Sequence, residues 1–315
     1  MSLTRFGLQI PSFTYAGVPD SELFERIAAI ALTAEEAGFD SVWVMDHFYQ
    51  LAMIGPPTEP MLEAYTLLAG LAARTHRVGL GALVTGVTYR NPALLAKTVT
   101  TLDVVSSGRA ILGIGAAWNE QEHAGYGFPF PPVKERMDRL EEALRICRAM
   151  FTEEAASVSG RYHSVSAALN NPRPIRGSIP ILVGGSGERR TLRLVAQYAD
   201  ACNLFGDPAT IRTKLEVLER HCDEVGRDPA EITKTALKTM LIRESAEEAE
   251  RAAAAASASP EQFRAMATIG GPDQICDEVQ AYLDAGLDGL IFNMADAGDP
   301  DRVALAGETL TKAFG

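Results

Sequence analysis

An acid and an imidazole stand side by side at the end of an apolar run, where Asp46 and His47 follow residues 41–45. An imidazole with a pKa near neutrality can donate or accept a proton in a reaction. If residues 41–46 form a strand, both groups stand at its C-terminal end, where the active sites of parallel α/β folds lie. The alternative is that the pair only caps the helix or turn that follows.

The alternation of side chains along this strand predicts which of them face the inside of a barrel. Val42, Val44 and Asp46 share one face, and Trp43 and Met45 share the other, because successive side chains point in opposite directions. Small branched side chains suit a crowded interior, whereas Trp43 and Met45 suit packing against surrounding helices. We therefore expect Asp46 to point into the mouth of the barrel.

A glycine-rich turn, Gly-Gly-Ser-Gly-Glu-Arg-Arg at residues 184–190, joins an apolar strand directly to a helix. Backbone N–H groups unhindered by Cβ, the helix N-terminus, the Ser186 hydroxyl and the Arg189 guanidinium together predict a phosphate site. The alternative is a tight turn that needs glycine only for a positive φ. A second run, at 113–118, resembles a dinucleotide fingerprint but has Trp118 in place of the third glycine, which argues against a Rossmann site.

Eight apolar strands alternate with helices along the chain. We expect strands over residues 6–10, 41–46, 78–85, 109–115, 180–183, 201–205, 234–242 and 289–293. We expect helices over 20–37, 61–75, 91–106, 133–151 and 208–225, from about 188, from 271, and over about 300–313. Eight alternating units predict an α/β fold, a (β/α)8 TIM barrel, as one domain over residues 1–315. Two insertions interrupt it, about 152–178 with a hairpin near 159–163, and about 245–268, which is Ala-rich and expected to be helical.

Composition narrows the classes of function. The net charge is −12 with scattered basic residues, which argues against a nucleic-acid surface. Because apolar runs fall far short of the roughly 18 residues that span a bilayer, and no secretory segment is evident, we expect a cytoplasmic protein without membrane contact. The four cysteines are widely spaced, with no Cys-x-x-Cys pair and no histidine at metal-ligand spacing, so we expect reduced thiols and no metal site.

Four collinear stretches resemble the luciferase-like (bacterial luciferase superfamily) barrels, and among these the branch that uses coenzyme F420, a deazaflavin. They are residues 43–48 (Trp-Val-Met-Asp-His-Phe), 80–92, 112–120 and 183–187. The resemblance covers essentially the whole chain. It implies an F420-dependent oxidoreductase that moves hydride between the deazaflavin and a small organic substrate, either an activated C=C or C=O or an alcohol.

The resemblance also implies roles for individual residues. Asp46 would touch the deazaflavin ring, and His47 would face the substrate as proton donor or acceptor. A non-proline cis peptide is expected between Ala82 and Leu83, in a bulge behind the ring. The other implied cofactor contacts are Thr85, Gly115, Ala116, Ala117, Trp118 and Asn119 around the ring, and Val183, Gly184, Gly185, Ser186, Gly187 and Arg189 near the phosphate.

One turn departs from the glucose-6-phosphate dehydrogenases of this superfamily, which carry a catalytic glutamate after the fourth strand. Residues 116–119 read Ala-Ala-Trp-Asn here, which argues against a sugar-phosphate reaction. Trp118 instead indicates an apolar substrate pocket with an aromatic wall, to which Phe13, Tyr15 and Leu51 could add.

Three ionisable side chains follow that turn, Glu120, Glu122 and His123. Their spacing does not match the glutamate of the dehydrogenases. We therefore interpret them as the start of a solvated helix rather than as catalytic groups.

Two other functions stay open on the sequence alone. An FMN-dependent luciferase-like monooxygenase would share the glycines and the barrel, and a catalytically silent barrel that only binds flavin would share the fold. The Asp-His pair resembles the deazaflavin branch more than the oxygen-activating one. Besides a small-molecule substrate, the expected partner is a second copy of the chain, in a homodimer through the apolar helices at 62–73 and 93–105.

Overall fold

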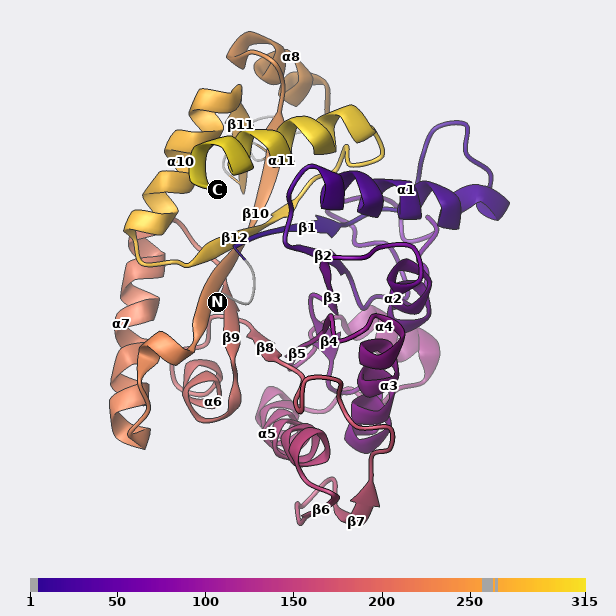
Figure 1. The fold of residues 1–315 in the computed structure, drawn as a ribbon, viewed down its shortest axis with the longest axis vertical. Helices are drawn as coiled ribbons and strands as arrows, with labels where there is room; N and C mark the ends of the chain where they lie inside the picture. The colour runs from indigo at the N-terminus through magenta and orange to yellow at the C-terminus, as the bar shows by residue number, and fades with distance from the viewer. Residues whose placement is uncertain (1–4, 257–262, 264–265) are drawn as a thin grey trace.

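The computed structural model describes residues 5–256, 263 and 266–315 (Figure 1). Within them, parallel strands pair in the order β12, β1, β2, β3, β5, β8, β9 and β10, and β10 pairs with β12 to close the ring. These strands are β1 (Phe6–Ile10), β2 (Ser41–Val44), β3 (Gly79–Ala82), β5 (Ala110–Gly115), β8 (Ile181–Gly184), β9 (Ala201–Leu204), β10 (Thr233–Ile242) and β12 (Gly289–Asn293). The predicted (β/α)8 barrel is confirmed.

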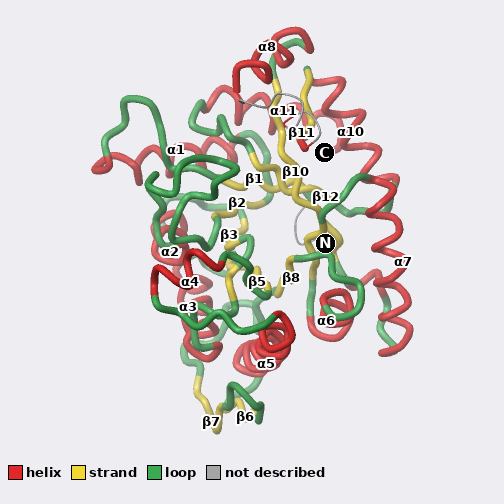
Figure 2. Tube along the Cα trace, turned by 180° about the vertical axis from the view of Figure 1, so that it is seen from behind, coloured by secondary structure: helices red, strands yellow, loops and turns green. Residues whose placement is uncertain are grey.

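Helices surround this barrel on its outer side, as Figures 1 and 2 show from opposite directions. They are α1 (Leu23–Glu36), α2 (Ala64–Ala72), α3 (Pro92–Val105), α5 (Val133–Thr152), α6 (Thr191–Tyr198), α7 (Pro208–Val225), α10 (Pro272–Asp284) and α11 (Pro300–Phe314). Their buried faces join the outward side chains of the strands in one extended apolar core. The strand ends are therefore held firmly, which is what a site built from side chains of several strands requires.

The inside of the barrel corrects one prediction from the sequence. Trp43 points inward and is fully buried among strand residues, whereas Val42 and Val44 pack outward with the helices. The indole fits because Gly7 and Gly81 lie beside it: a Cβ on Gly81 would stand 2.6 Å from Cζ3 of Trp43. A strand considered alone suggested that Trp43 was too large for the interior, but its neighbours in the sheet make the room.

The predicted insertions form structure outside the ring. Residues 152–178 contain the antiparallel pair β6 (Ala155–Val158) and β7 (Val165–Leu169), which confirms the hairpin. In 245–268 the helix is confirmed for α8 (Ala246–Ala256), but β11 (Ala267–Gly270) is a strand that pairs with the end of β10, so the prediction is wrong for 267–268. Residues 257–262 and 264–265 of that prediction lie outside the described part of the chain.

The sequence reading also missed two short elements near the site, β4 (Thr85–Gly86) and α4 (Glu120–Tyr126). In the described part of the chain, no helix is both long and apolar enough to cross a membrane.

Candidate active site

A cavity of about 840 Å³ opens at the C-terminal end of the barrel strands. Its wall comes from residues 45–47 after β2, 83–84 after β3, 115–119 around the end of β5, and 239–241 in β10. Most of these side chains are apolar. Because catalytic groups in this type of barrel come from the ends of several strands, this cavity is the candidate active site.

Asp46 lies in the wall of this cavity with both carboxylate oxygens engaged. It is 3% exposed, it accepts a hydrogen bond of 3.0 Å from the amide of Gly86, and Arg90 binds it in a bidentate ion pair at 2.8 and 2.9 Å. Burial alone would lower the pKa of Arg90, but the attraction of Asp46 outweighs it and raises this pKa, so the guanidinium stays charged. The pair fixes the segment after β2 to the start of α3.

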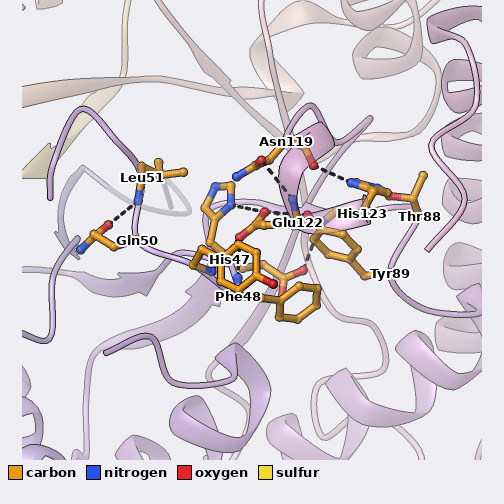
Figure 3. Close-up of polar contacts among 12 residues, drawn as sticks. His47, Phe48, Gln50, Leu51, Thr88, Tyr89, Asn119, Glu122 and His123 are labelled. Carbon is orange, nitrogen blue, oxygen red and sulfur yellow. Dashed lines mark hydrogen bonds and ion pairs between the residues drawn. The ribbon is translucent and has the colours of Figure 1, made fainter. Parts of the chain in front are cut away.

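His47, in the segment after β2, is paired with Glu122 of α4 (Figure 3). Its Nδ1 lies 2.9 Å from Oε2 of Glu122, whose side chain is fully buried, while the imidazole is 15% exposed. A carboxylate can only accept, so Nδ1 carries the hydrogen and Nε2 has its lone pair free in the neutral ring. No hydrogen-bond partner is found for Nε2 among the described residues, and the ring lines the cavity.

Glu122 receives hydrogen bonds from three further donors. The amides of Phe48 and Tyr49 donate to Oε1 at 2.5 and 3.0 Å, and the Tyr89 hydroxyl donates to Oε2 at 2.8 Å. Burial would raise the pKa of Glu122, but these donors and His47 outweigh it and lower the pKa. Glu122 is therefore a carboxylate at neutral pH, and it can stabilise a positive charge on His47.

The short helix α4 explains how Glu122 reaches this position. Asn119 caps its N-terminus by accepting from the amide of Glu122. His123 is also buried, with Nδ1 donating to the carbonyl of Asn119 at 2.6 Å and Nε2 at 2.6 Å from the hydroxyl of Thr88. The interpretation of a solvated helix start is thus wrong for Glu122 and His123 and holds only for the exposed Glu120.

A bulge interrupts the barrel wall after β3. The amide of Leu83 still donates to the carbonyl of Val44, so the ladder with β2 runs one residue past the end of β3. The cis peptide bond accordingly lies between Leu83 and Val84, one residue later than the predicted Ala82-Leu83. Gln9 supports the bulge, since its Nε2 donates to the carbonyl of Leu83 at 3.1 Å.

Comparison with known proteins places this arrangement in a family. Residues 4–261 match the family model described as luciferase-like monooxygenase. The chain belongs to the luciferase-like family. A relative from Kineococcus radiotolerans, named F420-dependent glucose-6-phosphate dehydrogenase, is 31% identical over 296 residues, covering 85% of this chain and 86% of the relative.

Solved structures share the fold of this luciferase-like chain. The F420-dependent tetrahydromethanopterin reductase from Methanopyrus kandleri matches with a TM-score of 0.80 and 20% identity, covering 99% of each chain. A monooxygenase from Streptomyces bottropensis matches with a TM-score of 0.82 and 21% identity, covering 99% of this chain and 100% of the other. Because proteins named for reduction and for oxygenation fit the same barrel equally well, the fold alone does not decide the cofactor.

The cavity of this luciferase-like chain is lined by most of the site residues predicted from the sequence. Those that line it are Asp46, His47, Leu83, Gly115, Ala116, Ala117, Trp118, Asn119, Gly184 and Gly185. Those that do not line it are Ala82, Thr85, Val183, Ser186, Gly187 and Arg189. Of the suggested extra walls, Leu51 lines the cavity, whereas Phe13 and Tyr15 do not.

Several of the residues outside the cavity wall have structural contacts of their own. The Thr85 hydroxyl lies 2.6 Å from the Tyr65 hydroxyl in the core. Ser186 accepts from the amide of Phe205 at 2.9 Å, and Arg189 lines a separate surface hollow. Within the glycine-rich turn, Gly184 and Gly185 thus face the cavity, and the residues after them lead away from it.

Sequence reasoning gave no role to Arg90, Tyr89 and Gln9, which the structure places at the site. Arg90 and Tyr89 stand just before the Asn-Pro helix start, close enough to the strand end to reach Asp46 and Glu122. Gln9 could have been predicted as a site residue, because a polar side chain in an otherwise apolar barrel strand contacts either a ligand or buried polar groups. Among the described residues, no group of three His, Cys, Asp or Glu side chains is arranged to hold a metal ion.

Proposed function

We propose that this protein is an F420-dependent oxidoreductase that moves hydride between the deazaflavin and a small organic molecule. The observation that carries the proposal is the His47–Glu122 pair, which presents one unpartnered imidazole nitrogen to the cavity. The name of the Kineococcus radiotolerans relative, an F420-dependent dehydrogenase, supports the same cofactor. The substrate would carry an activated C=C or C=O, or an alcohol in the reverse direction.

The cavity fits a flat cofactor together with a small substrate. Its volume of about 840 Å³ lies within the range of roughly 300–1,000 Å³ typical of ligand sites. Gln9 also lines it, and the Oε1 of this buried side chain has no hydrogen-bond partner. A buried acceptor without a partner costs about 1–3 kcal/mol, so a bound group that donates an N–H or O–H to Gln9 would be favoured.

The chain would contribute proton transfer to the reaction. A bound deazaflavin supplies or accepts the hydride, and the matching proton must come from or go to a group beside the substrate. Nε2 of His47 can accept a proton from an alcohol, because Nδ1 already donates to Glu122 and fixes the tautomer. In the reductive direction the protonated ring donates from Nε2, and the Glu122 carboxylate stabilises the imidazolium beforehand.

The charges around the cavity favour an uncharged substrate. Its ionisable lining residues in the described part of the chain are Asp46, His47, Arg243 and Asp296. Arg243 is paired with Asp296 at 2.7 Å, and Asp46 is held by Arg90, so the described lining offers no unpaired arginine or lysine for the phosphate of a sugar-phosphate substrate. Trp118, 59% exposed and edge-on to His47 at 5.5 Å between ring centroids, offers an aromatic wall instead. We therefore propose a small apolar ketone, enone, quinone, imine or alcohol rather than a sugar phosphate.

Hydride transfer with substrates of this class tests the proposal. The oxidised deazaflavin absorbs in the visible range, so single turnovers can be followed directly with enones, quinones, imines and alcohols. We expect the wild-type protein to turn over at least one class, and His47→Ala to bind F420 normally but to lose turnover with every substrate. Turnover that is unchanged in His47→Ala would overturn the assigned role, and a wild-type protein that binds but never reacts would indicate the silent barrel.

We further propose a homodimer and a cytoplasmic location. Leu94, Val104 and Val105 are exposed apolar side chains on α3, one of the helices expected at the dimer interface. The buried thiols of Cys147 and Cys202 are unpaired, which suits a reducing compartment. Light scattering after size-exclusion chromatography tests the dimer, and Leu94→Glu should shift the mass to that of a monomer.

A further inference from the structure

Arg136 of α5 is a buried cation that no carboxylate neutralises at short range. The residue is 7% exposed, and it forms no ion pair with another described residue. Burial lowers the pKa of this guanidinium, and attraction by the more distant Glu120 works against the shift. Because an unpaired charge is costly to bury, the contacts that Arg136 does make call for an explanation.

The side chain of Arg136 is tied to the turn after β5. Its Nη1 donates to the carbonyl of Ala117 at 2.6 Å, whereas the buried Nε has no hydrogen-bond partner among the described residues. The guanidinium also lies over the ring of Phe130, with Cζ 4.1 Å from the ring centroid, in a cation–π contact. Arg136 therefore joins α5 to the backbone of the cavity wall, because Ala117 lines the cavity.

The turn that Arg136 contacts is strained. Ala117 has a φ of +59°, in the left-handed region that residues with a Cβ rarely adopt. It lies between Gly115, the last residue of β5, and Asn119, which caps α4. A residue stays in this region only when its surroundings fix it, and such residues cluster at functional sites. The hydrogen bond from Arg136 is a restraint of this kind, because it fixes the direction of the Ala117 carbonyl.

Trp118, the next residue, takes its place at the cavity from this turn. Its indole is 59% exposed and makes no hydrogen bond with another described residue. It stands edge-on to the imidazole of His47, with 5.5 Å between the ring centroids. A side chain with so few contacts is directed mainly by its backbone. The position of the aromatic wall beside Nε2 of His47 thus depends on the conformation of the turn.

We propose that Arg136 is a positioning residue for the substrate: by holding the carbonyl of Ala117, it keeps the indole of Trp118 beside His47. This inference rests on the proposed function, because the substrate has to meet Nε2 of His47. Arg136 does not line the cavity, so it acts through Trp118 and not by contact with the substrate. We therefore expect Arg136 to affect substrate binding more than proton transfer.

Quenching of tryptophan fluorescence by acrylamide tests the position of the indole without cofactor or substrate. The chain has two tryptophans, and Trp43 is fully buried, so acrylamide reports mainly on Trp118. Arg136→Met removes the donors and the charge but keeps an apolar stem. It should raise the quenching constant and shift the emission to longer wavelength. Arg136→Lys keeps a charge and a donor without the planar fork, so it should be intermediate.

A double-variant cycle tests whether Arg136 acts through Trp118. With a ketone or alcohol that the wild type turns over, Arg136→Met should raise KM by about two- to twelvefold, the range for loss of one aromatic contact. The kcat value should stay within about twofold of the wild type. Trp118→Ala should raise KM at least as much. Adding Arg136→Met to Trp118→Ala should raise KM no further, because residues that act through one contact are not additive.

Arg139→Met is the matched control, the same substitution three residues further along α5. Arg139 is paired with Glu135 at 2.8 Å and lies over the ring of Tyr162, away from the turn. This variant should match the wild type in both assays. If circular dichroism shows that Arg136→Met does not fold, Arg136→Lys is compared with Arg139→Lys instead, and wild-type behaviour of Arg136→Lys would then overturn the inference.

The possible failures are distinguishable. If no ketone, enone or alcohol reacts with the wild-type protein, the proposed function is wrong, and the fluorescence measurement still decides whether Arg136 holds the indole. If Arg136→Met leaves the quenching of Trp118 unchanged, or if its effect on KM adds to that of Trp118→Ala, Arg136 does not act through Trp118. A fall in kcat at unchanged KM would also contradict the inference, because the effect would then lie on proton transfer.

Discussion

Replacing Glu122 by Gln tests the link between the buried carboxylate and the imidazole. Gln keeps the shape of the side chain, but it has one acceptor oxygen and an NH2 group where Glu122 has two acceptors. If its oxygen keeps the amides of Phe48 and Tyr49, the NH2 group faces Nδ1 of His47 and the hydroxyl of Tyr89. The hydroxyl can rotate to accept, and the imidazole can accept at Nδ1 only by moving its hydrogen to Nε2.

The expected loss follows from this exchange of donors and acceptors. The variant loses a charge-assisted hydrogen bond, worth about 1.5–3 kcal/mol, so the proton-transfer step should slow by roughly 10- to 150-fold. The neutral ring would also present N–H rather than a lone pair to the cavity, which blocks removal of a proton from an alcohol. Alcohol oxidation should therefore suffer more than F420 binding, which should stay within about twofold of the wild type.

The assay combines single-turnover kinetics, a binding titration and nitrogen NMR of the histidine ring. Glu120→Gln is the matched control, because Glu120 lies two residues before Glu122 on the same helix, is exposed, and does not line the cavity. Nitrogen shifts should report hydrogen at Nδ1 of His47 in the wild type and at Nε2 in Glu122→Gln. Wild-type rates in Glu122→Gln, or an unchanged tautomer, would refute the role given to the carboxylate.

Three further predictions concern stability, each measured by urea unfolding. The pKa of Glu122 in the folded protein lies below its ordinary 4.5, so its contribution to the free energy of unfolding is complete above pH 4.5 and is lost as the pH falls below that value. The difference in free energy of unfolding between the wild type and Glu122→Gln should therefore shrink at low pH. A difference that stays constant with pH would contradict this. Arg90→Ala leaves Asp46 buried without its partner and should cost about 3–5 kcal/mol, whereas a loss below about 1 kcal/mol would show the pair to be dispensable. Gly81→Ala places a Cβ 2.6 Å from the Trp43 ring and 2.9 Å from the carbonyl oxygen of Ile111, and it should cost about 1–3 kcal/mol. The part of this cost due to the ring should be relieved in combination with Trp43→Phe; equal losses in both backgrounds would show that the clash with Trp43 contributes nothing.

The fold could be predicted because its signals are local. Each strand is a short apolar run followed by a helix with a recognisable start, such as Asn91 before Pro92, whose side chain accepts from the amide of Ala93 at 2.9 Å. By contrast, whether a strand side chain points into or out of the barrel is not determined by the local sequence. Trp43 lies inside because Gly81 is its partner in the neighbouring strand and Gly7 stands beside its indole, and the pairing of strands is not visible in one segment.

Most residues of the cavity wall could be predicted from the sequence, but the partners of its ionisable side chains could not. His47 and Asp46 were found because they end a strand, but their partners lie far along the chain: Glu122 is 75 residues from His47, and Arg90 is 44 residues from Asp46. Glu122 was interpreted as solvated because α4 was not recognised, and its inward direction depends on contacts with residues distant in sequence, His47 and Tyr89 among them. Such pairings depend on where two loops meet, which periodicity does not report.

Equilibrium titration of the protein with F420 and, separately, with FMN and NADPH tests the central claim most directly. Quenching of tryptophan fluorescence should report binding, since Trp118 lines the cavity, and calorimetry gives an independent constant. We expect F420 to bind with a dissociation constant of about micromolar or tighter, and FMN and NADPH to bind much more weakly. A clear preference for FMN would contradict the assignment of the cofactor and would indicate an oxygen-dependent monooxygenase instead.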